Sequence, residues 1–191
     1  MIAADWELFV RHVQAEPAPP GGKDEDRHVS AEGAALYPKM RRLIEVALDG
    51  REIRRAITSG ILRANQTLYG VVGFEKEIPL MELAHLYAPQ EPGLQKKFGA
   101  FYEEVDANVD NKFGEVIVPE TFLTHQRDGE TTAHAQEMRD KWIWASSATK
   151  GTQQGGVGIT VGHTPEIELL LSELFPSERE DRKSTRLNSS H

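Results

Sequence analysis

Residues 157–174 read VGITVGHTPEIELLLSEL and combine an apolar run with a helical pattern. The run Ile159–Gly162 is compact and largely apolar, which predicts a buried strand. Pro165 is favourable in the first turn of a helix, and the apolar residues after it recur at helical spacing. These apolar residues are Ile167, Leu170, Leu171 and Leu174. A buried strand that leads directly into an amphipathic helix is typical of an α/β domain.

The same alternation of strands and helices runs through the rest of the chain. Strands are expected at Trp6–Val10, Ile53–Thr58, Ile78–Leu83 and Ile159–Gly162, with a brief extended stretch at 116–118. Helices are expected between Ser30 as N-cap and Gly50 as the stop, after Ser59-Gly60, at Leu94–Val105, at Thr131–Trp144 and after Pro165. Strands that alternate with helices predict an α/β fold with a largely parallel sheet.

Length and composition predict one soluble domain and exclude several kinds of chemistry. The chain has 191 residues, of which 39% are hydrophobic and 27% charged, an ordinary balance for a globular protein. No apolar run approaches the roughly 20 residues that span a bilayer, and the N-terminus does not resemble a signal peptide, so we expect a cytoplasmic protein. The absence of cysteine excludes disulfides, thiolate metal sites and cysteine nucleophiles. A formal net charge of −8 argues against nucleic acid as a partner, so a bound anion needs a local pocket.

Polar residues follow several of the expected strands. Arg11 and His12 end the first strand, the segment Ser59–Arg63 follows the second, Glu82 follows the third and His163 ends the last. In parallel sheets, ligands bind beyond the carboxyl ends of the strands. These four segments are therefore expected to converge at one edge of the sheet.

The same segments carry a family resemblance. Arg11-His12-Val13 resembles the Arg-His-Gly signature of the histidine phosphatase superfamily, and the stretches Asp26–Gly33, Ser59–Thr67 and Val161–Ile167 are similar to its later motifs, in the same order. The similarity covers roughly residues 7–174 and is thin between 83 and 158. It implies a phosphoglycerate mutase-like, three-layer α/β/α fold with a mostly parallel sheet.

The resemblance also implies a mechanism and a set of site residues. His12 would attack phosphorus and form a covalent phosphohistidine, which water then hydrolyses. Arg11, Arg63 and His163 would bind the phosphate oxygens, with His163 also counted as catalytic. Glu82 stands where some members place a proton donor for the leaving group, although a carboxylate there is commonly a solvated loop residue. Neither a metal nor a cofactor is implied, and the expected partner is a phosphorylated small molecule or a phosphoprotein.

The resemblance is imperfect, and alternatives stay open. Val13 replaces the signature glycine, so its side chain would narrow the pocket or shift the helix, and Thr164 replaces the usual asparagine. The leading interpretation is a metal-independent phosphatase acting on a phosphomonoester or a protein phosphohistidine. The alternatives are a phosphoglycerate mutase-like phosphotransferase and a catalytically silent phosphate-binding or interaction module. Neither the substrate nor the oligomeric state follows from the sequence.

Other signals favour structural roles. Residues 106–117 begin like a calcium loop, but Ile117 stands where such a loop requires a bidentate Glu. His125 and His134 lack ligand partners at metal spacing and are expected on a loop or a helix surface. Trp142 and Trp144 are expected to pack against the protein. The segment 85–130 is expected to cap the pocket and select the substrate.

The C-terminal tail has a different character. Residues 181–191 read DRKSTRLNSSH and resemble, codon by codon, the translation of a common sequencing adapter. We therefore expect a histidine phosphatase domain over residues 1–180 and a non-native tail. The family continues with further strands after the helix that follows its second histidine, so this domain is expected to be truncated at its C-terminus.

Overall fold

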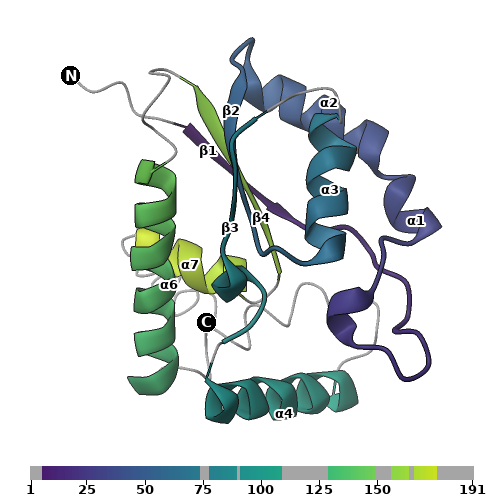
Figure 1. Cartoon of the computed structure of the whole chain (residues 1–191), viewed down its shortest axis with the longest axis vertical. Helices are drawn as coiled ribbons and strands as arrows, with labels where there is room; N and C mark the ends of the chain where they lie inside the picture. The colour runs from purple at the N-terminus through teal and green to yellow at the C-terminus, as the bar shows by residue number, and fades with distance from the viewer. Residues whose placement is uncertain are drawn as a thin grey trace, which may run out of the picture. The chain divides into compact units, whose positions relative to one another are not determined.

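The computed structural model describes residues 6–73, 78–89, 91–108, 129–148, 156–163 and 166–175 (Figure 1). The chain divides into two compact units, Met1–Ala88 with Lys141–His163, and Pro89–Asp140 with Thr164–His191. The first unit contains the sheet and all the predicted site residues.

The sheet has four described strands, all parallel, in the order β1-β4-β2-β3. They are β1 (Trp6–Arg11), β2 (Ile53–Thr58), β3 (Leu80–Glu82) and β4 (Val157–Gly162). All six residues of β4 are buried, as the apolar run predicts. The parallel sheet is therefore confirmed, although β3 is shorter than the expected segment Ile78–Leu83 and already includes Glu82.

The first unit also holds α1 (Ala31–Ala34), α2 (Tyr37–Leu48), α3 (Leu62–Val72) and the 3₁₀ turns η1 (Asp24–Asp26) and η2 (Ala84–Leu86). Ser30 is the N-cap of α1, because its hydroxyl accepts a hydrogen bond from the Gly33 N–H at 3.0 Å. The single helix expected up to Gly50 is broken, since Pro38 in the first turn of α2 has no N–H to continue α1. Helix α2 ends at Leu48, and its C-cap Asp49 has the left-handed conformation at φ 49°, one residue before Gly50.

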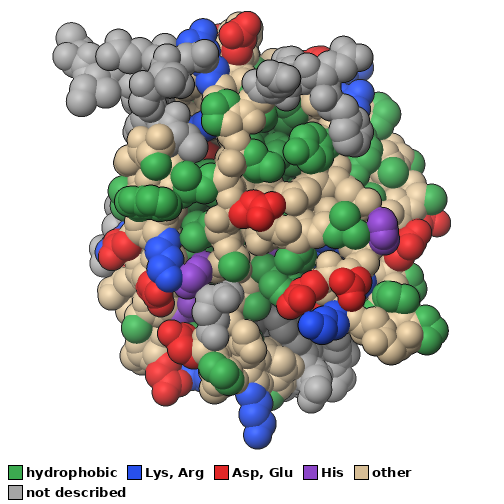
Figure 2. Space-filling view, viewed as in Figure 1, with side chains coloured by type: hydrophobic (Ala, Val, Ile, Leu, Met, Phe, Trp, Pro, Cys, Tyr) green, Lys and Arg blue, Asp and Glu red, His purple; other side chains and the backbone are tan. Residues whose placement is uncertain are grey.

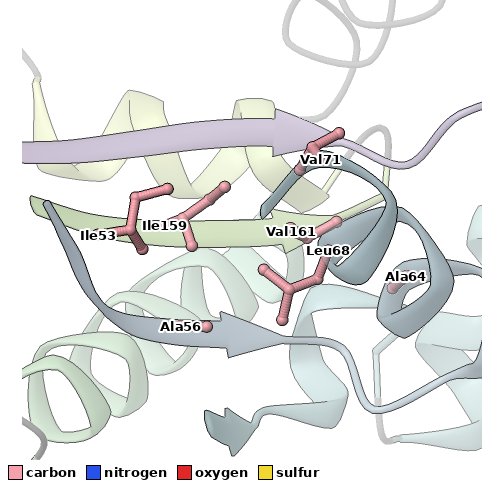
Figure 3. Close-up of a cluster of buried hydrophobic side chains, with 7 residues drawn as sticks. All are labelled: Ile53, Ala56, Ala64, Leu68, Val71, Ile159 and Val161. Carbon is pink, nitrogen blue, oxygen red and sulfur yellow. The ribbon is translucent and has the colours of Figure 1, made fainter. Parts of the chain in front are cut away.

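The core lies between the sheet and α3. Ala64, Leu68 and Val71 on α3 face residues of β2 and β4 (Figure 3). The strand residues of this cluster are Ile53, Ala56, Ile159 and Val161. On the opposite face, Trp142 of α6 (Gly129–Ala148) packs on Phe9, with ring centroids 5.6 Å apart. Helices therefore contact both faces of the sheet, which is the predicted α/β/α layering.

A polar network lies beside Trp142 on that second face. Arg55 and Glu7 form an ion pair at 2.8 Å, and both side chains are less than 10% exposed. The Thr160 hydroxyl donates to the other Glu7 oxygen at 2.6 Å and accepts from the Trp142 indole at 3.0 Å. A Cβ at position 158 would collide with Glu7 Oε2 and lie 2.7 Å from Arg55 Nε. Gly158 thus makes room for the ion pair.

The second unit contains α4 (Pro92–Asn108), the first part of α6 and α7 (Glu166–Leu174). The Phe98 and His134 rings meet edge-on at 5.9 Å, and Arg139 pairs with Glu173 at 3.4 Å. His134 is only 3% exposed, so the prediction of a surface position was wrong. The helices expected at Leu94–Val105 and Thr131–Trp144 are both present and longer than predicted.

The two tryptophans of α6 differ in their exposure. Trp142 packs as expected, but Trp144 is 67% exposed, so the prediction that it packs was wrong. The extended stretch 116–118, the later positions of the calcium-like loop, His125, Thr164 and the tail 181–191 lie outside the described residues.

The described helices include none that is both long and apolar enough to cross a membrane. No group of three or more potential metal ligands occurs among the described side chains. Acidic and basic side chains are interspersed over the face shown in Figure 2.

Candidate active site

Backbone hydrogen bonds continue the sheet beyond the strand ends and bring the predicted segments together. The N–H of His12 donates to Gly162 at 3.0 Å, and the N–H of Ser59 donates to Val161 at 3.2 Å. The His163 N–H donates to the Leu86 carbonyl at 3.1 Å. These bonds place the residues after β1, β2 and β4 at one edge of the sheet, as predicted.

The two histidines lie side by side. The His12 and His163 ring centroids are 4.4 Å apart, with the rings tilted by 45°. Nδ1 of His12 lies 2.6 Å from the Val13 carbonyl oxygen. A carbonyl can only accept, so this contact assigns the proton to Nδ1 and leaves Nε2 with a free lone pair. His12 therefore presents an unprotonated nitrogen.

Burial and nearby cations keep His12 neutral. Burial lowers the pKa of His12 to about 4, against a raising effect of the hydrogen bond to Val13. The positive charges of Arg63 and Arg11 lower this pKa further. At neutral pH the ring is thus uncharged, which is the form that can act as a nucleophile.

His163 is held by a residue that the motif reading did not assign a role. Its Nε2 lies 3.0 Å from the Ser59 hydroxyl, and the edge of its ring meets Tyr87 at 5.1 Å between centroids. Burial, His12 and Arg63 lower the pKa of His163 to about 2. If the Ser59 hydroxyl donates to Nε2, Nδ1 carries the proton and becomes a hydrogen-bond donor.

Arg63, in the first turn of α3, is 4% exposed and is already paired. Its Nη1 donates to the Asp24 carbonyl at 2.5 Å and its Nη2 to the Asp24 carboxylate at 2.6 Å. The guanidinium also lies 5.5 Å from the centre of the Tyr87 ring. Its Nε is buried without a hydrogen-bond partner among the described residues. An unsatisfied donor on a buried cation is costly, so this nitrogen is suited to an anionic ligand.

Asp24 and Tyr87 were missed by sequence reasoning. Burial would raise the pKa of Asp24, but hydrogen bonds from Arg27 and Arg63 lower it to about 2, so Asp24 is a carboxylate. The Tyr87 hydroxyl donates to this carboxylate at 2.9 Å, and burial together with Asp24 raises the pKa of Tyr87 to about 12. The clustered cations of the site are one signal that a carboxylate should lie near them, but nothing in the sequence selects Asp24.

Arg11 and Glu82 are less closely tied to the two histidines. Arg11 is exposed and pairs with none of the described residues, although its charge acts on both His12 and His163. Glu82 is exposed and accepts a hydrogen bond from Asn65 at 3.2 Å. Since neighbouring strands are about 4.8 Å apart, the end of β3 lies roughly 14 Å from the end of β1. None of the described contacts joins Glu82 to either histidine.

Val13, which stands in place of the signature glycine, packs beside α1. The Val13 side chain is 6% exposed, and one of its methyl groups lies near the Cα of Gly33 in α1. Its N–H donates to the Thr67 hydroxyl at 3.2 Å. The side chain thus fills space between the loop and α1.

Comparisons with known proteins support the fold. No protein-family model matches the sequence, and no curated protein matches it either. Several solved structures are similar in fold. A candidate phosphohistidine phosphatase, SixA, from Agrobacterium tumefaciens has a TM-score of 0.52 at 16% identity, over 96% of this chain and 83% of that one. Phosphoglycerate mutase from Bacillus anthracis str. Sterne has a TM-score of 0.52 at 16% identity, over 90% and 80%. The alpha-ribazole phosphatase from Shigella flexneri has a TM-score of 0.51 at 16% identity, over 88% and 79%. The chain therefore has the α/β fold of these solved structures, which is the phosphoglycerate mutase-like fold predicted from the sequence.

Proposed function

We propose that the protein is a metal-independent phosphatase that hydrolyses a phosphomonoester or a protein phosphohistidine through a covalent intermediate on His12. One observation carries the proposal: Nδ1 of His12 is bonded to the Val13 carbonyl, so Nε2 is free, beside His163 and within the field of Arg63. The fold neighbours include proteins named as phosphatases and a mutase, which agrees with this chemistry.

The first step joins Nε2 of His12 to phosphorus and breaks the bond from phosphorus to the leaving group, which departs with the electron pair. The imidazole then carries a positive charge, and its Nδ1–H bond to the Val13 carbonyl becomes charge-assisted and stronger. In the second step water attacks phosphorus, the P–N bond breaks, and inorganic phosphate leaves. Arg63, Arg11 and Nδ1–H of His163 would stabilise the equatorial oxygens in both steps.

Release of phosphate from an aryl phosphate tests the proposal. The variant His12→Ala should lose nearly all activity. The matched control is His28→Ala, because His28 is an exposed histidine of the same loop region whose ring contacts Gln66. Acid-labile phosphohistidine on the wild type, detected by ³¹P NMR after rapid quenching, would identify the intermediate. Equal activity in wild type and His12→Ala would refute the proposal.

The same experiment separates the other two activities. A mutase-like phosphotransferase would keep the phosphohistidine and pass it to a sugar acid. A silent binding module would bind phosphate and form no phosphohistidine at all.

Glu82 is proposed as the proton donor to the leaving group. Because it lies away from His12 across the sheet, it would act only on the departing oxygen of a substrate that extends toward β3. Glu82→Gln should therefore slow hydrolysis of alkyl phosphates, which need a proton, more than hydrolysis of aryl phosphates with acidic leaving groups. Equal slowing of both substrate classes would leave Glu82 without this role.

A further inference from the structure

The contact between Arg63 and Asp24 occupies the place that phosphate is expected to take. Arg63 uses two of its nitrogens on the backbone carbonyl and the carboxylate of one residue. Two oxygens of a phosphate can accept from the same two nitrogens that now bind the Asp24 carbonyl oxygen and one carboxylate oxygen. Asp24 therefore occupies the two donors of Arg63 that a phosphate ligand would use.

The contact also buries the cation. The side chain of Arg63 is 5% exposed, whereas that of Asp24 is 45% exposed. The carboxylate is held by two further donors, Arg27 at 2.7 Å and the Tyr87 hydroxyl at 2.9 Å. Asp24 thus lies on the solvent side of Arg63, and the turn η1 brings it there.

Simultaneous binding of a phosphate and the Asp24 carboxylate to Arg63 is electrostatically unfavourable. A phosphomonoester brings up to two negative charges against a group that already carries one, and like charges a few ångströms apart repel strongly in a half-buried site. The turn η1 is short, and all three of its residues are exposed, so little apolar surface resists its displacement.

We propose that Asp24 is a built-in competitor for phosphate, and that the turn Asp24–Asp26 moves away from Arg63 when a phosphorylated ligand binds. This inference rests on the proposed function, because it takes Arg63 as a phosphate ligand. In most molecules of the free protein Arg63 is then paired with Asp24, which we call the closed state. The apparent dissociation constant for phosphate equals that of the open state divided by the fraction of molecules in which Arg63 is unpaired.

Binding of inorganic phosphate, measured by calorimetry at fixed ionic strength, tests the inference without any catalysis. Asp24→Asn removes the competing charge and should lower the dissociation constant by about tenfold, if about a tenth of wild-type molecules are open. Glu25→Gln is the matched control, since it removes the same charge from the same exposed turn, and its dissociation constant should stay close to that of wild type. The substitution Arg63→Ala should abolish phosphate binding both in the wild-type protein and in the Asp24→Asn variant.

If Asp24 instead positions Arg63 for phosphate, Asp24→Asn should raise the dissociation constant for phosphate. Weaker or unchanged phosphate binding in Asp24→Asn would overturn the inference, as would an equal gain in Glu25→Gln or the absence of binding to every variant. Hydrogen exchange of residues 23–27 adds a second readout, because phosphate should accelerate exchange there if the turn is displaced. These outcomes differ from a failure of the proposed function, in which phosphate binds as described but His12→Ala hydrolyses aryl phosphate as fast as wild type.

Discussion

Lowering the pH should protonate a free imidazole well before it protonates His12. Burial, with the charges of Arg63 and Arg11, lowers the pKa of His12 from 6.5 to about 4. At pH 6 about 1% of His12 rings would then be charged, against about three quarters of the rings of an unperturbed histidine. An NMR titration of the imidazole C2–H signals measures this directly, with His12→Asn to identify the signal.

The same lowered pKa couples protonation of His12 to folding. In the unfolded chain His12 takes up a proton as the pH falls through 6.5, but in the folded chain it does so only near pH 4. The unfolded state binds more protons in that window, so stability that is present above pH 6.5 is lost toward pH 4. The shift corresponds to about 3 kcal/mol. His163, whose pKa is lowered to about 2, adds to the loss in the same direction.

Urea denaturation at pH 7 and pH 4.5 measures the loss, and His12→Asn serves as the control because it has no ring to titrate. The variant should lose less stability than wild type over this interval. A measured pKa above 6 for His12 would refute the electrostatic account of the site. So would ¹⁵N spectra that place the proton on Nε2, since the free lone pair depends on the bond from Nδ1 to Val13.

Three other substitutions test the fold that supports the site. Gly158→Ala should destabilise the protein by roughly 1–3 kcal/mol in urea denaturation, because its Cβ collides with the Glu7–Arg55 pair. Gly99→Ala is its control, since nothing lies near that Cβ in α4, and it should be neutral or stabilising by up to about 1 kcal/mol; equal effects of the two would contradict the packing described. Val13→Gly should cost roughly 2–3 kcal/mol of stability without raising phosphatase activity, because the side chain packs near α1, and a gain in activity would show that it obstructs the site. Ser30→Ala should lower the melting temperature through the loss of about 1 kcal/mol from the α1 cap, and an unchanged melting temperature would rule out that contribution.

The features that sequence reasoning predicted are those set by local pattern. The strands β1, β2 and β4 appear as apolar runs, and a parallel sheet places their carboxyl ends at one edge whatever the loops do. That rule places His12 and His163, which are 151 positions apart, at the same edge, and the pairing of β1 with β4 makes them neighbours. Glu82 follows the same rule but ends on the far strand of the sheet, because strand order is not readable from the local pattern.

The features that were missed depend on loop conformation or on weak patterns. Asp24 and Arg63 are 39 positions apart in the sequence, and Ser59 and His163 are 104 positions apart. Each pair meets through turns whose conformation cannot be predicted from a periodic pattern. The helix Gly129–Ala148 has no clear apolar stripe, so neither the burial of His134 nor the exposure of Trp144 could be predicted. A helix without an amphipathic pattern leaves its buried face undetermined until the tertiary structure is known.

The charges of the site explain why the free protein and a phosphate complex should differ in protonation. In the free site burial, together with the cationic arginines, keeps both histidines neutral, and the Asp24 carboxylate, which raises the pKa of His163, only partly offsets these effects. A phosphate dianion in place of that carboxylate would add negative charge beside His163 and raise its pKa further. His163 would then take up a second proton and become positively charged while it donates to a phosphate oxygen. His12, in contrast, must stay neutral until its Nε2 attacks. The neighbouring rings would thus take different charge states during the reaction, because a charge on one ring disfavours a charge on the other at 4.4 Å.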